Sequence, residues 1–245
     1  MQKRSLYYLI ALSVILVSCE GILDPPEDKL PAKLDFSFGM NTHVVETDKQ
    51  DQTAFAHNQS QGFSLTQGQI ILENISFDGR RGEGRKDVFF TSDFSQPYHI
   101  QLGETPHIPG IAFDIPQGVY PMVEVTLHLG NGELPAIVME GMFQRGVSQP
   151  VAVRYEYNHR EQVRIRANAG QANQQIVFSK EEPLRATIVL HTESLLRLIN
   201  LGLIMQAQTV MINGEEVLLI NEQTNPSIYN SMSARLQQAF SLDIE

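Results

Sequence analysis

The segment that decides the fold class is Val119-Tyr-Pro-Met-Val-Glu-Val-Thr-Leu-His-Leu129. Apolar and polar side chains alternate along it, with one face formed by Val123, Val125, Leu127 and Leu129 and the other by Met122, Glu124, Thr126 and His128. Successive side chains of a strand point to opposite faces of a sheet, so this period of two predicts a strand with one buried and one solvated face.

Short segments of the same kind recur on both sides of it, separated by Gly, Pro, Asn and Asp. The predicted strands are Leu34–Phe38, Gln69–Phe77, Val88–Thr91, Tyr98–Leu102, Ile111–Ile115, Val119–Leu129, Ala136–Phe143, Val151–Tyr157, Val163–Ala167 and Leu184–Leu190. No long amphipathic helix interrupts them, which favours an antiparallel β-sandwich over βαβ units. We therefore expect an all-β domain over residues 34–190.

Two of these strands suggest a hairpin. Val151–Tyr157 and Val163–Ala167 are joined by a short polar segment, and the register that places Glu156 opposite Arg164 also places Tyr155 opposite Ile165. Charge and packing favour the same pairing, and Tyr155 and Tyr157 are expected in the core.

Residues 191–245 have a different character and predict a short α+β extension packed on the sandwich. A helix is expected from Thr192, its N-cap, to Asn200, with Gly202 as a stop. Asn213-Gly214 predicts a type I′ hairpin turn between Thr209–Ile212 and Glu215–Ile220. Asn225-Pro226 then begins a helix whose apolar stripe is formed by Ile228, Met232, Leu236, Ala239 and Phe240.

The amino terminus reads as an export signal. Lys3 and Arg4 precede an apolar run from Leu6 to Val17, which is too short to span a bilayer. Leu16-Val-Ser-Cys19 resembles the lipobox of bacterial lipoproteins, and this resemblance implies cleavage after residue 18 and acylation of Cys19. Two or more acyl chains anchor a protein stably. Residues 19–33, acidic and rich in proline, are expected to form a flexible tether.

The stretch Phe113-Asp-Ile-Pro-Gln-Gly-Val-Tyr120 resembles the Pro-x-Gly-x-Tyr turn of transthyretin-like sandwich domains. With its flanking strands it is similar to a family of uncharacterised Gram-negative lipoproteins, over roughly residues 34–190. The resemblance implies a sandwich in which the Tyr120 hydroxyl bonds back to nearby backbone. It also implies attachment to the outer membrane, on its periplasmic or its surface face, and it supplies no reaction.

Composition excludes several classes of function. The 245 residues carry a net charge of −10, and removal of residues 1–18 leaves 16 basic against 28 acidic residues. Neutralising phosphates takes a clustered basic surface, so we expect no nucleic-acid partner. The single cysteine can close no internal disulfide.

No catalytic or nucleotide-binding motif is present, and with Cys19 acylated no thiol remains for catalysis. We therefore expect a protein that is not an enzyme and has no cofactor. The seven histidines are scattered singly, which predicts no metal site; an approach of His99 to His107 across a proline-containing turn is the alternative.

One basic cluster stands out on this acidic chain, formed by Arg80, Arg81, Arg85 and Lys86 among glycines. A flexible, soluble hairpin loop between the flanking strands is one interpretation. The other is a contact site for an anionic glycan, a lipopolysaccharide phosphate or an acidic partner protein.

These features predict a lipid-anchored cell-envelope protein that acts as a binding or structural module. One alternative is a fimbria- or adhesin-type component, which an exposed, unpaired sheet edge would favour. The other is an accessory glycan-binding lipoprotein, which an exposed cleft with aromatic and polar side chains would favour. The absence of tryptophan argues against a flat aromatic sugar platform, although Tyr98 could stack on a sugar.

Overall fold

The computed structural model describes residues 30–46, 62–82, 84–92, 94–144, 149–168, 175–197 and 199–245. The predicted signal segment, Cys19 and most of the predicted tether lie outside these residues. None of the helices within the described ranges has the length and apolarity needed to cross a bilayer.

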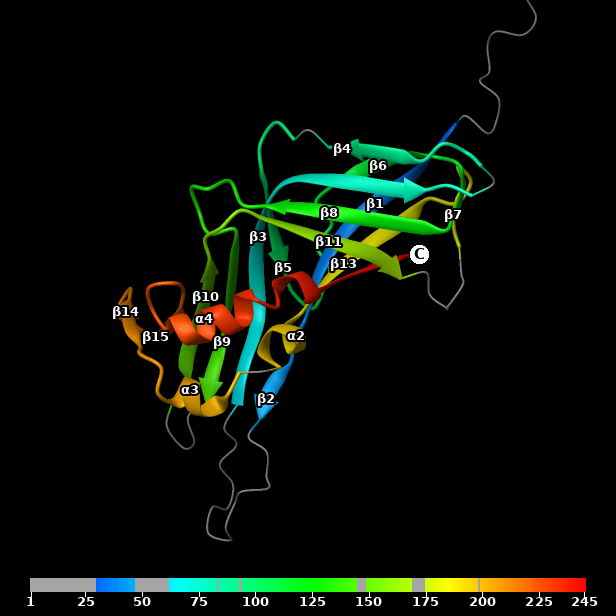
Figure 1. Ribbon diagram of the computed structural model, residues 1–245. Coiled ribbons are helices and arrows are strands. Elements are labelled where there is room, and N and C mark those ends of the chain that lie inside the picture. The colour runs from blue at the N-terminus through cyan, green and yellow to red at the C-terminus, as the bar shows by residue number, and fades with distance from the viewer. Residues whose placement is uncertain are drawn as a thin grey trace, which may run out of the picture.

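Strands dominate the described part of the chain (Figure 1). In chain order they are β1 (Pro31–Asn41), β2 (Val44–Glu46), β3 (Gly62–Arg80), β4 (Val88–Thr91), β5 (Tyr98–Leu102), β6 (Ala112–Pro116), β7 (Gly118–Tyr120), β8 (Met122–Leu129), β9 (Ile137–Gln144), β10 (Val151–Tyr157), β11 (Glu161–Asn168), β12 (Ile176–Phe178), β13 (Leu184–His191), β14 (Val210–Ile212), β15 (Glu215–Ile220) and β16 (Phe240–Ile244). Each strand predicted from the sequence overlaps at least one of these. The alternation of apolar and polar residues follows the alternation of buried and exposed faces along a strand.

The sheet is organised around β3, a strand of 19 residues. Its first half pairs with β9 and its second half with β8. At the junction Ile71 bonds through its N–H to the Ala136 carbonyl and through its C=O to the Gly130 N–H. Both groups of one residue point to the same side of a strand, so β8 and β9 lie along one edge of β3. The other edge is left for β2, β5 and β4, which pair with successive parts of β3.

The remaining strands extend this arrangement into one large curled sheet with the order β14-β15-β10-β9-β3-β8-β11-β16-β13-β1-β6. β7 and β12 form a separate two-stranded sheet. The all-β class is confirmed. The finer expectation of an antiparallel sandwich is not: the sheet is mixed, with parallel pairs β1–β13, β10–β15 and β11–β16.

The predicted hairpin between residues 151–157 and 163–167 is wrong, although both segments are strands. β10 pairs with β9 and β15, whereas β11 pairs with β8 and β16. Arg164 lies opposite Thr126, and Tyr155 lies opposite Met139. β8 and β9 follow one another along β3, so β11 beside β8 and β10 beside β9 lie in different parts of the sheet. The turn at Asn158–Arg160 connects these two parts.

The carboxyl-terminal region is part of the same sheet. β16 lies between β11, to which it is parallel, and β13, to which it is antiparallel. The expected domain boundary at residue 190 therefore falls inside the sheet. The Asn-Gly hairpin is confirmed: Asn213 and Gly214 have φ angles of 53° and 88°, and they join β14 to β15.

The helices are short: α2 (Thr192–Leu196), α3 (Leu201–Met205), α4 (Pro226–Ser233) and the 3₁₀ turn η4 (Leu236–Gln238). Thr192 does not cap α2; its buried hydroxyl donates to the Asn41 carbonyl and accepts from the His43 N–H. Gly202 lies inside α3 and stops no helix. Helix α4 begins at Pro226 as predicted, but the Asn225 amide bonds to the Gln208 and Leu219 carbonyls instead of capping it.

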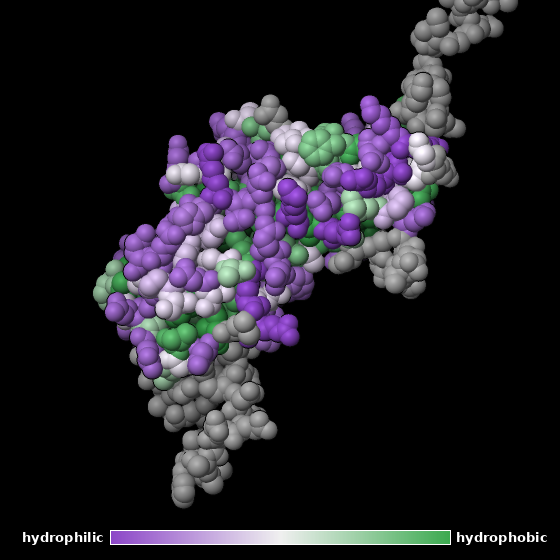
Figure 2. Space-filling view, in the orientation of Figure 1, coloured by the Kyte–Doolittle hydropathy of each residue, from purple (hydrophilic) through white to green (hydrophobic). Residues whose placement is uncertain are grey.

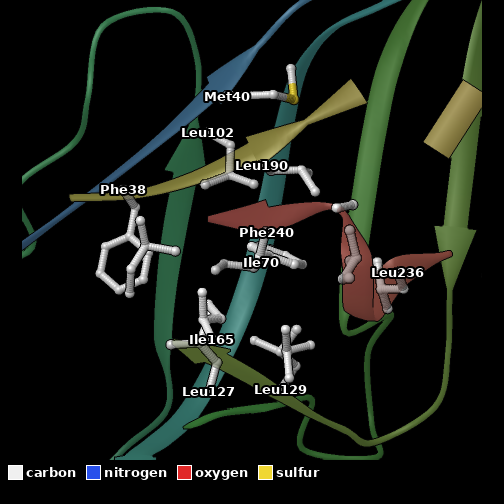
Figure 3. Packing of buried hydrophobic residues seen from close by; sticks show 14 of the residues in the cluster. Phe38, Met40, Ile70, Leu102, Leu127, Leu129, Ile165, Leu190, Leu236 and Phe240 are labelled. Atoms are coloured by element: carbon white, nitrogen blue, oxygen red, sulfur yellow. The ribbon is translucent and has the colours of Figure 1, made fainter. Parts of the chain in front are cut away.

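The core fills the inside of the curl (Figure 3). Side chains far apart in sequence meet there, including Phe38, Ile70, Leu127, Leu190 and Phe240, none more than 8% exposed. The predicted stripe from Ile228 to Phe240 is buried as expected, although it is shared among α4, η4 and β16. Roughly 25 cal/mol per Å² of buried apolar surface makes this burial the main stabilising contribution.

Tyr155 and Tyr157 are buried as predicted, and both rings stack on Tyr229 of α4. The Tyr155 hydroxyl shares a 2.9 Å hydrogen bond with the Ser233 hydroxyl, and the Tyr157 hydroxyl donates to the Glu161 carboxylate over 2.7 Å. Burial raises the pKa of all three tyrosines above the usual value of 10.0.

Replacement of Gly141 tests the close approach of β9 to β3. A Cβ at this position would lie 1.9 Å from the Ser64 carbonyl oxygen and 2.7 Å from Leu65 Cα, so backbone would have to move. We expect Gly141→Ala to lower the free energy of unfolding by about 1–3 kcal/mol in urea titrations. Gly103→Ala is the matched control, because no atom lies within 4 Å of its added Cβ. Equal stability of the two variants would contradict the register.

The tyrosine cluster predicts a loss of stability at alkaline pH. The unfolded chain releases the phenol protons near pH 10, whereas the folded chain retains them to higher pH, so the free energy of unfolding is intact below about pH 10 and falls above it. Urea titrations at about pH 9 and pH 11 should show this fall. Tyr155→Phe should make it shallower, and an unchanged slope would show that burial of Tyr155 is not its source.

Candidate functional site

The outward side of the sheet over β3, β8 and β11 is polar where the inward side is apolar. On β8 the inward residues are at most 1% exposed, while the alternate residues face solvent. We define the polar face as the outward residues of these strands and of β4: Asn74, Ser76, Asp78, Phe89, Thr91, Glu124, Thr126, His128, Gln162, Arg164 and Arg166. Figure 2 shows that hydrophilic residues predominate on this side of the molecule.

Strand register arranges these side chains in rows across the sheet. One row runs from Phe89 through Asp78 and Glu124 to Arg166, and the next from Thr91 through Ser76 and Thr126 to Arg164. A third places Asn74, His128 and Gln162 side by side. Directly opposite residues on one face lie about 5 Å apart, so each row presents a continuous set of polar groups.

An open groove of about 250 Å³ follows these rows. Its lining combines two hydroxyls, two carboxylates, an amide, an imidazole, a guanidinium and one aromatic ring: Ser76, Asp78, Phe89, Glu124, Thr126, His128, Gln162 and Arg164. Phe89 is 71% exposed, more than any other large hydrophobic residue in the described ranges. An exposed ring next to polar groups offers a ligand both an apolar surface and hydrogen-bonding partners.

Hydrogen bonds fix one side of the groove. The Ser76 hydroxyl lies 2.8 Å from the Thr91 hydroxyl and 2.9 Å from His128 Nε2, which holds the imidazole in place. The carboxylates of Asp78 and Glu124, by contrast, make no hydrogen bond or ion pair with any residue that the structure describes. Asp78 and Glu124 lie directly opposite each other, which is destabilising for like charges, and Arg166, opposite Glu124 on its other side, offsets part of this repulsion.

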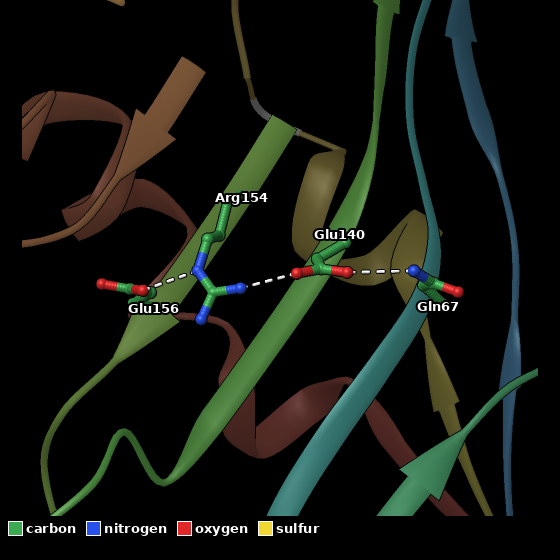
Figure 4. A network of polar contacts seen from close by, with 4 residues as sticks. All are labelled: Gln67, Glu140, Arg154 and Glu156. Carbon is green, nitrogen blue, oxygen red and sulfur yellow. Dashed lines mark hydrogen bonds and ion pairs between the residues drawn. The ribbon is translucent and has the colours of Figure 1, made fainter. Parts of the chain in front are cut away.

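The other half of the sheet also carries charges on its outward side, but these satisfy one another (Figure 4). Arg154 lies between Glu156 and Glu140, with N–O distances of 2.7 and 2.6 Å, and Gln67 donates to Glu140 over 2.9 Å. This network links β3, β9 and β10 and stabilises their register. Its hydrogen-bonding groups are engaged within the protein, which favours a structural role.

A second pocket, of about 480 Å³, lies where β1 and β13 end and is lined by Asn41, Thr42, His43, Glu104, His191 and Glu193. Several of these groups already bond to one another: Thr42 donates to Glu104, and His191 contacts both Asn41 and Ser241. Its lining includes no Phe, Tyr or Trp. Across the described ranges, no three His, Cys, Asp or Glu side chains converge to hold a metal ion.

The predicted basic cluster is divided by the structure. Arg81 is half-buried: its guanidinium donates to the Gln117 carbonyl over 2.6 Å and lies 5.7 Å from the centre of the Tyr120 ring. Arg80 is exposed and pairs with Asp87 at 3.6 Å. Arg85 and Lys86 are exposed. Arg81 thus has a structural role that composition did not reveal, while the other three lie at the surface.

The turn that Arg81 contacts has the hydrogen bond expected from the Pro-x-Gly-x-Tyr resemblance. The Tyr120 hydroxyl donates to the Pro116 carbonyl over 2.7 Å, and the ring is fully buried against Phe77 and Phe178. Burial raises the pKa of Tyr120, while the charges of Arg81 and Arg85 oppose this shift.

His99 and His107 have different partners. His99 Nδ1 contacts the Gln69 amide over 2.9 Å, and His107 pairs through its backbone with Phe38. Sequence analysis did not single out Phe89, Asp78 or Gln162. One signal was available: in the four-residue strand Val88–Thr91, adjacent Phe89 and Phe90 must face opposite sides, so one ring had to point outward.

Comparisons with models of protein families, with curated proteins and with solved structures find no match to this chain. The function is therefore argued from the groove and from the sequence.

The Tyr120 corner gives a stability prediction. Tyr120→Phe removes one buried hydrogen bond and leaves the Pro116 carbonyl without this donor, so we expect a loss of about 1 kcal/mol in the free energy of unfolding. Tyr98→Phe is the control, because its hydroxyl makes no hydrogen bond with the described residues. If the two variants unfolded at the same urea concentration, the corner would not contribute to stability.

Proposed function

We propose that the chain is a lipid-anchored protein of the bacterial cell envelope that binds a glycan in the groove of the polar face. The observation that carries the proposal is the exposed Phe89 ring beside a groove lined by planar polar side chains. This is the cleft with aromatic and polar side chains that favours the glycan-binding alternative.

The chemistry of the groove suits a sugar. A pyranose presents hydroxyl groups around its rim, which both donate and accept hydrogen bonds, and a face of C–H groups that packs on an aromatic ring. Asp78 and Glu124 offer hydrogen-bond acceptors, and Arg164 offers donors. Gln162 offers both a donor and an acceptor. The unpartnered carboxylates are hydrated in the free protein and gain hydrogen bonds when a ligand replaces that water.

Several features support binding without catalysis. Ser76 and His128 are in hydrogen-bond contact, but the same Ser76 hydroxyl also contacts Thr91 and is almost buried. A nucleophile needs a free approach for its substrate and donors for the developing charge. The groove lies on an open sheet face, an arrangement suited to holding a chain molecule against the surface.

The sheet edges give less support to a fimbria-like assembly role. The strands at the two ends of the sheet order are β14, of three residues, and β6, of five residues ending at Pro116. Very short edge strands and edge prolines are devices that discourage pairing with another chain.

The location in the envelope rests on the sequence alone. The basic start, the short apolar run and the single cysteine at position 19 support export and acylation. A protein held on a membrane by its amino terminus can retain a glycan near the cell surface or present it to other envelope proteins.

Phe89→Ala and Glu124→Gln test the groove. A microarray of bacterial, plant and animal polysaccharides probed with the mature protein should show binding, and each substitution should weaken it about tenfold or more, because it removes a stacking surface or a charged acceptor. Met211→Ala is the control, since Met211 is 68% exposed but lies on β14, away from the groove. A lack of glycan binding by the unmodified protein, or equal binding by all variants, would overturn the proposal.

A further inference from the structure

The basic cluster lies at the end of the molecule where the chain enters the fold. Leu30, the first described residue, accepts a 2.8 Å hydrogen bond from the Gln117 amide, and Pro31 pairs with Pro116. Gln117 is also the residue whose carbonyl accepts from Arg81. The loop from β3 to β4, the Gln117 turn and the start of β1 therefore form one end of the molecule, at the right in Figure 1.

The proposed function states that Cys19 is acylated, and this inference rests on it. An acylated Cys19 keeps this end of the molecule within a limited distance of the membrane. Leu30 lies eleven positions after Cys19, so eleven Cα–Cα steps connect them. A fully extended chain covers at most about 3.6 Å per residue, so Leu30 stays within about 40 Å of the lipid surface.

Arg81 fixes the base of the loop, and the Arg85 guanidinium lies beside the same turn, 3.6 Å from where a Cβ on Gly118 would be. Arg81 is held by Gln117 and Tyr120, and its N–H donates to the Asp87 carboxylate over 3.1 Å. Arg80, Arg85 and Lys86 are all exposed. Asp87 pairs with Arg80 at this end, the nearby Lys180 and Glu181 pair with each other at 3.6 Å, and the exposed Glu182 beside them adds one negative charge.

The rest of the molecule has the opposite sign. Without residues 1–18 the chain carries a net charge of −12, which an anionic bilayer repels. Basic residues at the tethered end offset this repulsion locally, because each Lys or Arg close to an anionic membrane contributes about 1 kcal/mol of attraction.

We propose that Arg80, Arg85 and Lys86 bind the phosphates of anionic lipid headgroups in the membrane that carries the anchor. This contact holds the β3–β4 loop on the lipid surface and directs the end with α3 and β14 away from it (Figure 1). The acyl chains attach the protein, and the loop orients it.

Hydrogen–deuterium exchange of the lipidated mature protein tests this contact. The protein is reconstituted in vesicles of phosphatidylcholine, with or without phosphatidylglycerol. We expect backbone exchange across residues 84–88 to be at least about tenfold slower in the anionic vesicles, and the slowing to disappear in about 0.5 M salt, which screens surface charge. Equal exchange in the two kinds of vesicle would overturn the proposal.

A pair of matched variants separates this contact from general charge effects. Arg85→Ser/Lys86→Ser should lose the slowing, whereas Arg197→Ser/Arg235→Ser, which removes two charges near the helices, should keep it. Loss of the slowing in both would overturn the specific contact. Mass spectrometry of the amino-terminal peptide distinguishes the two proposals: an unacylated Cys19 overturns the anchor and this inference with it, whereas an acylated Cys19 without slowing overturns only the lipid contact.

Discussion

The structure depends on the pairing of β3 with five other strands. Its 19 residues are lined by β9 and β8 along one edge and by β2, β5 and β4 along the other. A strand of this length cannot stay straight around a compact core, and the register shifts near Leu65 and after Leu72 are where it departs from regular pairing. Everything attached to it follows the resulting curl.

Because the sheet curls, its inward side forms the apolar core and its outward side faces solvent. Inward residues from β1, β3, β8, β13 and β16 close on one apolar core, and β16, at the very end of the chain, completes it between β11 and β13. Outward residues stay in register across β4, β3, β8 and β11. The same alternation that buries Val125 and Leu127 therefore assembles Glu124, Thr126 and their neighbours into a groove.

Some charged side chains of this protein form ion pairs or hydrogen bonds within the fold, and others do not. Arg154 satisfies two carboxylates, and Arg81 closes the Gln117 turn over Tyr120. Asp78, Glu124 and Lys86 have no such contact within the described residues, and these are the groups for which our proposals supply a ligand or a lipid. Such charge costs little at a surface in water, and Arg166 opposite Glu124 offsets part of the repulsion between Glu124 and Asp78, so the pair is tolerated and its carboxylate oxygens stay available to a ligand.

The sequence by itself determined the strands, the Asn-Gly hairpin and the burial of Tyr155 and Tyr157, because each depends on alternation or turn chemistry within a few residues. The Tyr120 hydrogen bond was expected only from the resemblance of its turn to those of other sandwich domains. Only the tertiary structure decided which strands are neighbours, that Arg81 is structural, and that Phe89, Asp78 and Gln162 share one groove. Those facts arise from pairings between segments up to about 150 residues apart, such as β1 with β13. Local periodicity carries no information about partners at that distance, since any strand with an apolar face can be buried beside many others.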